Sequence, residues 1–376
     1  MQLAMVAGEA SGDLLGGALL AGLHQRWPDL QAAGIGGPRM AAQGFDAWWP
    51  HEKLAVRGYV EVLRHYREIS AIREALATRL LAEQPQAFIG VDAPDFNLGL
   101  EARLRAAGVK TIHFICPSIW AWRGGRAKKM AASCDLVLCL FPFEPELLAQ
   151  HGVAATFVGH PLADAIPLVP PRAAARAALG WSDQESGVAV MPGSQRSEIA
   201  AIAPAFLQAA VRMHQQRPEL RFVLPVAPGL RALLDPLVAA HAPGLPLQLL
   251  DGQSHTALAA CDVTLIASGT ATLEAALFKR PMVIGYRMHP ISWQIMKRLR
   301  YQPWVGLPNI LLGEFAVPEL IQEACQPDAL ARAVLAWLDD APGRDRLARR
   351  FDDLHHLLRC DTARCATDAI AQALQL

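Results

Sequence analysis

The stretch Asp262-Val-Thr-Leu-Ile-Ala-Ser-Gly-Thr-Ala-Thr-Leu-Glu274 indicates how this chain folds. Residues 263–267 predict a short buried strand, Ser268-Gly269-Thr270 a tight turn, and residues 271–278 a helix. A small-residue turn that opens a helix presents unpaired backbone N–H groups and the positive end of the helix dipole, which together bind anions. Glu274 lies about one helical turn beyond Thr270, where its carboxylate suits a ribose diol.

A second turn of the same kind is Met191-Pro-Gly-Ser194. It follows the apolar run 187–191 and leads into a helix with Glu198 near its start. Two phosphate-binding turns in one half of the chain indicate a sugar-nucleotide site, with Gly193 and Ser194 at one turn and Ser268, Gly269 and Thr270 at the other.

Strand-like and helix-like segments alternate along the chain, which is typical of parallel sheets built from βαβ units. Strands are expected at residues 3–7, 31–35, 87–91, 110–115, 136–140, 156–158, 188–191, 221–225, 247–250, 263–267 and 281–286. We therefore predict an α/β fold that binds its ligands at the carboxyl ends of the strands.

Length and proline content set the expected domain boundaries. The 376 residues suit two domains. The prolines between Pro161 and Pro171 can continue neither a helix nor a central strand, and they predict a linker. We expect one domain over residues 1–165, a second over 172–326, and a helical tail over 327–376.

Composition excludes several classes of protein. The 35 basic and 35 acidic side chains give a net charge of zero, which argues against nucleic-acid binding. The seven cysteines form no Cys-x-x-Cys pair, as expected for reduced, mostly buried thiols. No secretory signal and no membrane span are expected. His113, His151 and His160 lack metal-ligand spacing, so no metal site is expected.

Polar residues follow two expected strands of the first domain. In Val6-Ala-Gly-Glu-Ala-Ser-Gly-Asp13, the side chains of Glu9, Ser11 and Asp13 come at a strand's carboxyl end. They suit a binding role, but Ser11 or Asp13 is equally suited to cap the next helix.

In Gly90-Val-Asp-Ala-Pro-Asp-Phe-Asn97, Pro94 restricts Ala93 to extended geometry. Asp95 or Asn97 is the expected helix N-cap. Asp92, at the strand end, is the better candidate for a general base that takes a proton from a substrate hydroxyl.

Tryptophans mixed with cations occur in two further stretches. Cys116–Arg126 contains Trp120 and Arg123, which suit a phosphorylated or amphiphilic ligand, although ordinary packing explains them equally well. The basic, aromatic region from Tyr286 to Trp304 suits an anionic lipid surface, or a partly buried helix with a solvated edge.

Taken in order, several motifs resemble those of the lipid-A-disaccharide synthase family, from about residue 3 to the tail. They are Ala7-Gly-Glu-Ala-Ser-Gly-Asp13, Gly36-Gly-Pro-Arg-Met40, Asp92-Ala-Pro-Asp-Phe-Asn97, Ser118-Ile-Trp-Ala-Trp-Arg123, Gly159-His160-Pro, Pro192-Gly-Ser194, Ala267-Ser-Gly-Thr270 with Glu274, and Leu307-Pro-Asn309. The resemblance implies a glycosyltransferase-B-type fold of two Rossmann-like domains facing a cleft.

The resemblance also implies an activity: transfer of 2,3-diacylglucosamine from its UDP-activated form to 2,3-diacylglucosamine 1-phosphate. The implied products are a β-1,6-linked tetraacyl disaccharide 1-phosphate and UDP. The family acts without a metal or another cofactor at the inner face of the cytoplasmic membrane, as a peripheral protein. The resemblance further implies a homodimer that exchanges C-terminal helices, with the tail on the first domain or on a partner subunit.

Residue roles carried by the resemblance agree with those expected from spacing. The two turns would hold the diphosphate, Glu274 the ribose, and Asp92 would deprotonate the acceptor 6-hydroxyl. Asn309 matches a functional asparagine of the family. The family usually has arginine directly after Pro-Gly-Ser, where this chain has Gln195 followed by Arg196. Arg196 is therefore a candidate replacement for that phosphate contact.

Three alternatives remain open from the sequence. They are a glycosyltransferase of the same fold with a soluble acceptor, a UDP-sugar 2-epimerase, and a non-catalytic protein that binds lipid surfaces. An acyl-chain pocket is expected in the first domain, near Trp48, Trp49 and residues 56–63, where apolar side chains are dense.

Overall fold

The chain forms two compact units in a computed structural model that describes residues 1–54, 59–120, 125–288, 293–294, 296–297 and 302–376. Unit 1 comprises residues 1–164 and 358–376, and unit 2 comprises residues 165–357. The predicted pair of parallel-sheet α/β folds with a helical C-terminal region is confirmed. Among the described helices, none is both long and apolar enough to cross a bilayer.

Unit 1 contains a seven-stranded parallel sheet in the order β3-β2-β1-β4-β5-β6-β7. Its strands are β1 (Gln2–Ala7), β2 (Gln31–Gly36), β3 (Asp46–Pro50), β4 (Ala87–Val91), β5 (Lys110–Phe114), β6 (Leu136–Cys139) and β7 (Ala155–Phe157). Its helices are α1 (Ala10–Arg26), α2 (Pro38–Ala41), α3 (Tyr59–Glu83), α4 (Pro94–Ala106), α5 (Arg126–Ser133), α6 (Glu144–Ala149), α7 (Pro161–Ala165) and α17 (Thr362–Leu374).

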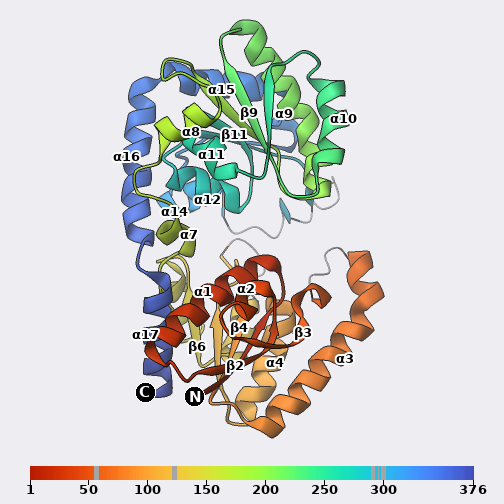
Figure 1. Ribbon diagram of the computed structural model, residues 1–376, viewed down its shortest axis with the longest axis vertical. Coiled ribbons are helices and arrows are strands. Elements are labelled where there is room, and N and C mark those ends of the chain that lie inside the picture. Colours follow the sequence, from red (N-terminus) through yellow and green to blue (C-terminus); the bar gives the residue numbers. More distant parts are fainter. Residues whose placement is uncertain (55–58, 121–124, 289–292, 295, 298–301) are drawn as a thin grey trace. The chain divides into compact units, whose positions relative to one another are not determined.

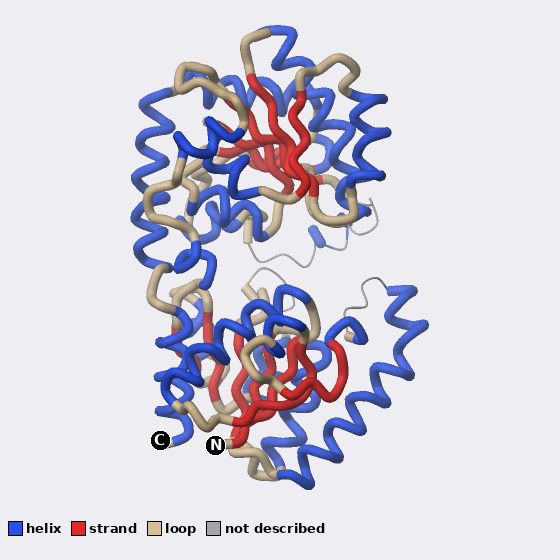
Figure 2. The backbone as a smooth tube through the Cα atoms, in the orientation of Figure 1, coloured by secondary structure: helices blue, strands red, loops and turns tan. Residues whose placement is uncertain are grey.

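Apolar side chains cover both faces of this sheet, as a doubly wound fold requires. Leu3, Met5 and Ala7 of β1 point to the face that α1 and α17 cover, whereas Ala4 and Val6 point to the face that α3 and α4 cover. Figures 1 and 2 show the sheet of unit 1 between these two layers of helices.

Unit 2 contains a six-stranded parallel sheet in the order β10-β9-β8-β11-β12-β13. Its strands are β8 (Gly187–Met191), β9 (Arg221–Val226), β10 (Leu247–Asp251), β11 (Val263–Ala267), β12 (Met282–Tyr286) and β13 (Glu319–Ile321). Its helices are α8 (Arg172–Ala178), α9 (Arg196–Gln216), α10 (Arg231–His241), α11 (Ser254–Ala260), α12 (Thr270–Leu277), α14 (Leu307–Leu312), α15 (Pro327–Asp339) and α16 (Ala341–Leu358).

The tail is divided between the two units. Helix α15 packs on α9 in unit 2, whereas α17 packs on α1 in unit 1. The close α1–α17 packing depends on Gly22, where a Cβ atom would lie 2.9 Å from the carbonyl oxygen of Ala363. Arg26 of α1 and Asp368 of α17 form an ion pair at 2.9 Å.

The structure contains three short elements that the sequence did not predict. The proline-rich stretch at 161–171 contains the helix α7, in which Pro161 occupies the first position, where a missing N–H is tolerated. Strands β3 and β13 were not expected; both lie at sheet edges and are partly exposed, so they lack an apolar signature.

Candidate active site

Both sheets place candidate residues at a topological switch point, where the strand order reverses. In unit 1 the first strand β1 lies beside β4, and in unit 2 the first strand β8 lies beside β11. The loops that follow two such adjacent strands lead away in opposite directions. This leaves a crevice at the carboxyl ends of the strands, where doubly wound folds bind ligands. The segments that follow these four strands carry most of the predicted site residues, apart from Trp120, Arg123 and Asn309.

At the switch point of unit 1, the loops after β1 and β4 touch each other. A Cβ atom on Gly8 would lie 2.9 Å from the Cβ of Ala93. Asp92 and Ala93 both have positive φ values, 53° and 44°. Two successive left-handed residues turn the chain from β4 into α4 and leave Asp92 half-buried at the strand end.

Asn97 was expected only as a helix cap, but its side chain instead stabilises this turn through hydrogen bonds. It is fully buried, and its Nδ2 donates to the carbonyl oxygen of Asp92 at 2.8 Å and to that of Val6 at 3.4 Å. The end of β1 is thereby tied to the backbone of the candidate base.

Two expectations for this loop were wrong. Ala93 is left-handed rather than extended, because the chain must reverse direction within two residues. Ala93 itself is the N-cap of α4, without a side-chain cap, so neither Asp95 nor Asn97 fills that position. Asp95 lies in the first turn, is exposed, and pairs with Arg126 at 2.6 Å.

The polar residues after β1 divide into two roles. Glu9 is the N-cap of α1, and Ser11 lies exposed in its first turn, so the expectation that Ser11 or Asp13 caps this helix was wrong. Asp13 is 2% exposed, and its carboxylate accepts backbone N–H groups of Gly37, Arg39 and Met40 at 2.8, 2.9 and 3.0 Å. Asp13 therefore caps α2.

Trp120, from the loop after β5, is held by a buried carboxyl group. Its Nε1 donates to Glu144 at 3.0 Å, and Glu144 also accepts the backbone N–H of Phe141 at 3.0 Å. Burial raises the pKa of Glu144 to about 7, although these hydrogen bonds oppose the shift. Arg123 lies outside the described residues.

His160, which follows β7, is also buried in this part of unit 1. Burial lowers its pKa to about 4, partly offset by the charge of Asp164. Its Nδ1 accepts the N–H of Leu162 at 3.1 Å, which fits a neutral ring. The His160 ring lies 5.6 Å from that of Phe141, and so belongs to the aromatic cluster around Trp120.

At the switch point of unit 2, Ser268-Gly269-Thr270 forms the turn between β11 and α12. Gly269 has a φ of +154° and is the N-cap of α12, which begins at Thr270. Ser268 Oγ donates to the carbonyl oxygen of Val305 at 3.0 Å, and Thr272 Oγ1 donates to that of Gly269 at 2.7 Å. Gly269 and Thr270 remain exposed at the helix N-terminus.

Glu274 lies on α12, one turn from this N-terminus, with its side chain 20% exposed. Its Oε2 is 3.3 Å from Nε2 of His255 on α11. Sequence analysis missed His255, because nothing in the local pattern shows that the starts of α11 and α12 are neighbours.

In the Gly193–Arg196 turn, two backbone N–H groups are hydrogen-bonded by a side chain of the helix that follows, α9. Glu198 Oε2 accepts the N–H groups of Ser194 and Gln195, both at 3.3 Å, while the Gln195 side chain caps the start of α9. A Cβ atom on Gly193 would lie 2.7 Å from Glu198 Oε2, so the turn requires glycine. Gln195 therefore serves as a helix cap, and the exposed Arg196 is the first residue of α9.

Asn309 is fully buried and lies on α14. Its side chain donates to the carbonyl oxygen of Val317 and to Glu319, and accepts the N–H of Val317, each at 2.9 Å. Glu319 in turn accepts the N–H groups of Val305 and Gly306 at 3.0 and 2.9 Å. Asn309 therefore supports the segment that receives the Ser268 hydroxyl, rather than lying open to a ligand.

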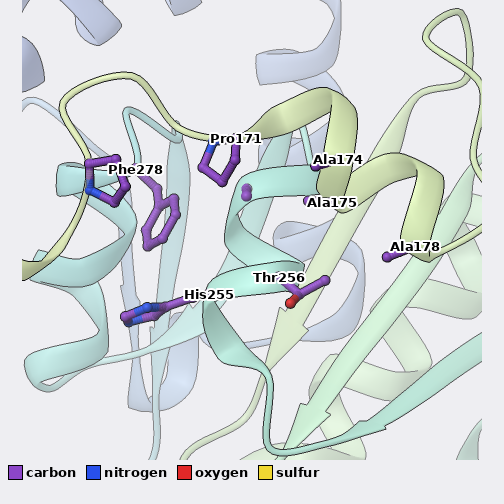
Figure 3. Close-up of a pocket in the computed structure, with 9 residues that line it drawn as sticks. Pro171, Ala174, Ala175, Ala178, His255, Thr256 and Phe278 are labelled. Carbon is purple, nitrogen blue, oxygen red and sulfur yellow. The ribbon is translucent and has the colours of Figure 1, made fainter.

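An apolar pocket of about 350 Å³ lies in unit 2, between α8 and α11. Figure 3 shows Ala174, Ala175 and Ala178 of α8 together with His255 and Phe278. The rings of His255 and Phe278 are 5.1 Å apart. His255 therefore lines this pocket and also contacts the Glu274 carboxylate.

The predicted acyl-chain region is described only in part. Trp48 and Trp49 lie on β3 and pack against the core beneath α3 and α4. The Arg79 guanidinium lies 3.5 Å from the centre of the Trp48 ring. Residues 55–58 and the side chains of 59–66 lie outside the described part, as does much of the basic region 289–301.

Known proteins are similar to this chain over nearly all of its length. Residues 3–370 match the family described as lipid-A-disaccharide synthetase. The lipid-A-disaccharide synthase of Albidiferax ferrireducens is 58% identical over 380 residues, covering 100% of this chain and 98% of the relative.

Solved structures share the fold at low identity. The UDP-GlcNAc 2-epimerase of Neisseria meningitidis, bound to UDP-GlcNAc, has a TM-score of 0.65 and 10% identity, with 100% of both chains covered. CalG4, the calicheamicin glycosyltransferase, has a TM-score of 0.61 and 16% identity, with 100% of this chain and 98% of CalG4 covered. The motifs at both switch points, the full-length match and the identity of 58% lead to one conclusion: the chain belongs to the lipid-A-disaccharide synthase family.

Proposed function

We propose that this glycosyltransferase of lipid A biosynthesis condenses UDP-2,3-diacylglucosamine with 2,3-diacylglucosamine 1-phosphate. The products are the β-1,6-linked disaccharide 1-phosphate and UDP. The observation that carries this proposal is the placement of the candidate residues at the switch points of both units. The acceptor-side candidates belong to unit 1 and the nucleotide-side candidates to unit 2.

In the proposed mechanism, Asp92 takes the proton of the acceptor 6-hydroxyl while that oxygen attacks the anomeric carbon. Direct displacement breaks the bond from the anomeric carbon to UDP and inverts the configuration there. Glu9 and Ser11, which follow β1, are candidates to orient the acceptor, together with Trp120 and Arg123. Asp95 would contribute only by leaving its ion pair with Arg126.

The leaving UDP is assigned to unit 2. The N-terminus of α12 at Gly269 and Thr270 would stabilise the charge that develops on the diphosphate, with Gly193, Ser194 and Arg196 at the start of α9. Glu274 would accept hydrogen bonds from the ribose hydroxyls. Asn309 would act on this site through Glu319 and Val305.

Both substrates carry acyl chains, so the enzyme must reach them at a lipid surface. We assign it to the inner face of the cytoplasmic membrane as a peripheral protein. Co-sedimentation with vesicles of anionic phospholipid tests this assignment. Binding that disappears at high salt would support it, and protein that stays in the supernatant under all conditions would contradict it.

A homodimer with exchanged C-terminal helices is a separate proposal. Here α17 packs on α1 of its own chain, and exchange would supply identical contacts from a second copy. Sedimentation equilibrium of the full chain and of an Arg26→Ala variant tests it. A wild-type protein that stays monomeric at micromolar concentration would contradict the dimer.

The test of the reaction is UDP release by purified protein given UDP-2,3-diacylglucosamine, with and without 2,3-diacylglucosamine 1-phosphate in detergent micelles. Release that requires the acceptor, with a disaccharide product, would support the proposal. Turnover of UDP-N-acetylglucosamine without any acceptor would indicate an epimerase instead. Release that is supported by a soluble sugar acceptor would indicate a different glycosyltransferase of this fold.

A further inference from the structure

The two candidate phosphate turns of unit 2 differ in what surrounds their backbone N–H groups. They follow the neighbouring strands β8 and β11, which pair in parallel with Met191 beside Ile266, so both turns lie at the same edge of the sheet. At the start of α12, the N-cap Gly269 has no side-chain cap, and the first turn of the helix contains no acidic residue. The first turn of α9, by contrast, contains Glu198.

The Glu198 carboxylate lies where an anionic ligand of the α9 turn would lie. Its Oε2 accepts the N–H groups of Ser194 and Gln195, and backbone donors of this kind are those that bind a phosphate oxygen at a helix start. The same Oε2 would be 2.7 Å from a Cβ atom on Gly193, and the φ of Gly193 is +119°, so only glycine admits the carboxylate here. A ligand phosphate must therefore take these two donors from Glu198.

The two hydrogen bonds of Glu198 are weak enough to be exchanged. Both are 3.3 Å long, beyond the usual range of about 2.7–3.2 Å for N–H···O bonds. Asp13 of unit 1 gives the contrast, since its buried carboxylate accepts three backbone N–H groups at 2.8, 2.9 and 3.0 Å. Ser194 and Gln195 are exposed and Glu198 is only partly buried, so its carboxylate can move into water without leaving an unpaired charge inside the protein.

The covalent order of the nucleotide determines which phosphate meets Glu198. In the proposed site Glu274 binds the ribose, and Glu274 belongs to α12, the helix whose N-cap is Gly269. The α-phosphate is bonded directly to the ribose, so it belongs at the start of α12, and the β-phosphate is the one that reaches the α9 turn. UMP has a single phosphate and uses only the open turn, whereas UDP must displace Glu198.

We propose that Glu198 sets the affinity for the diphosphate: its carboxylate occupies the β-phosphate position of the α9 turn and is displaced when UDP or the UDP-sugar binds. The displacement weakens the binding of diphosphate ligands, because the carboxylate and the phosphate need the same donors and repel each other. Monophosphate binding is unaffected, and the product UDP leaves more readily. This inference rests on the proposed role of the two turns as the diphosphate site.

The first test compares UDP and UMP binding in the wild type and in Glu198→Gln by calorimetric titration. The glutamine is neutral and competes less well for the two N–H groups, so UDP should bind roughly tenfold more tightly, while UMP affinity should stay within about twofold. Glu219→Gln is the matched control, because it also removes one negative charge, but from an exposed position just before β9, at the opposite edge of the sheet. It should change neither affinity.

The outcomes of this titration separate the inference from the proposed function. UDP affinity that is unchanged or lower in folded Glu198→Gln would overturn the inference, as would an equal gain for UDP and UMP. Wild-type protein that binds neither nucleotide would contradict the nucleotide side of the proposed function, and the inference with it. Circular dichroism and urea denaturation establish that each variant is folded.

The second test follows the carboxylate in the wild-type protein. In protein labelled with ¹³C at glutamate Cδ, the Glu198 signal is the one missing from Glu198→Gln. Saturating UDP should move this signal, because the carboxylate loses its two N–H donors, whereas saturating UMP should leave it in place. A Glu198 signal that UDP leaves in place, or that UMP moves equally, would overturn the inference.

Discussion

The side-chain amide of Asn309 donates a 2.9 Å hydrogen bond to the carboxylate of Glu319, and that carboxylate holds the backbone of Val305 and Gly306. Ser268, at the candidate diphosphate turn, donates its hydroxyl to the carbonyl oxygen of Val305. A buried asparagine is thereby connected to the candidate diphosphate turn through three hydrogen bonds in succession.

Replacing Asn309 by alanine should lower the free energy of unfolding by about 3 kcal/mol, because it leaves Val317 and Glu319 with unpaired buried groups. It should also weaken UDP binding. Urea denaturation and calorimetric UDP titration measure the two effects. Glu319→Gln disturbs the same segment and should weaken UDP binding too. Normal UDP affinity in Glu319→Gln, with weak binding in Asn309→Ala, would indicate instead that Asn309 contacts the nucleotide.

Asp92→Asn should abolish sugar transfer while leaving UDP affinity within a few-fold of the wild type. The amide keeps the shape of the side chain but cannot take the proton of the acceptor hydroxyl. The measurement is disaccharide formation alongside UDP titration by calorimetry. Asp95→Asn is the control, since that exposed carboxylate pairs with Arg126. Transfer at the wild-type rate in Asp92→Asn would remove Asp92 from the mechanism.

Glu274→Ala should weaken UDP binding by roughly 1–3 kcal/mol, the contribution of a hydrogen-bonded carboxylate to a polar ligand. Deoxyuridine diphosphate, which lacks the ribose 2′-hydroxyl, should lose much less affinity on the same substitution. His255→Ala serves as the control, because it removes a neighbour of Glu274 but keeps the carboxylate. Equal losses for UDP and its deoxy analogue would argue against a ribose contact.

Asp13→Asn should lower the free energy of unfolding by about 2–4 kcal/mol, because an amide has one accepting oxygen where the carboxylate accepts three backbone N–H groups. Chemical denaturation measures the loss. Ser11→Ala, a change at an exposed position on the same helix, should alter stability by less than about 0.5 kcal/mol. An Asp13→Asn protein that is fully stable but inactive would point to substrate binding rather than to support of α2.

Glu144 should make stability depend on pH. Its folded pKa of about 7 lies above the ordinary value of 4.5, so its contribution is fully present below pH 4.5 and is lost as pH rises through 7. Relative to Glu144→Gln, the wild type should therefore lose about 3 kcal/mol between pH 4.5 and 8.5. Urea denaturation of both proteins across this range checks it, with Glu146→Gln on the same helix as control. A difference that stays constant with pH would contradict the assignment.

Local sequence patterns predicted the strands that consist of continuous apolar runs. Val263–Ala267 and Ala87–Val91 are strands as expected, because apolar runs between small-residue turns have few alternatives. The edge strands β3 and β13 were missed, since their partly exposed residues show neither alternation nor a continuous apolar run.

Candidate residues were found where a turn follows a strand, but their roles depended on distant partners. Asp13 binds backbone groups beyond residue 36, and Glu101 meets His113 only when α4 lies across the sheet. A histidine within the apolar strand Lys110–Phe114 was the available signal for that pair. Sequence spacing alone does not show which carboxylate pairs with that histidine.

The assignment of α17 to unit 1 has a consequence for how the protein is made. Residues 1–164 are synthesised before unit 2, but the helix that completes unit 1 is synthesised only after all of unit 2. Until then the face of α1 around Gly22 has no covering helix from its own chain. Unit 2 is contiguous and can fold once its own residues have been synthesised, whereas unit 1 remains incomplete until α17 has been synthesised. A stop codon before residue 358 would leave unit 1 permanently incomplete and exposed to proteases.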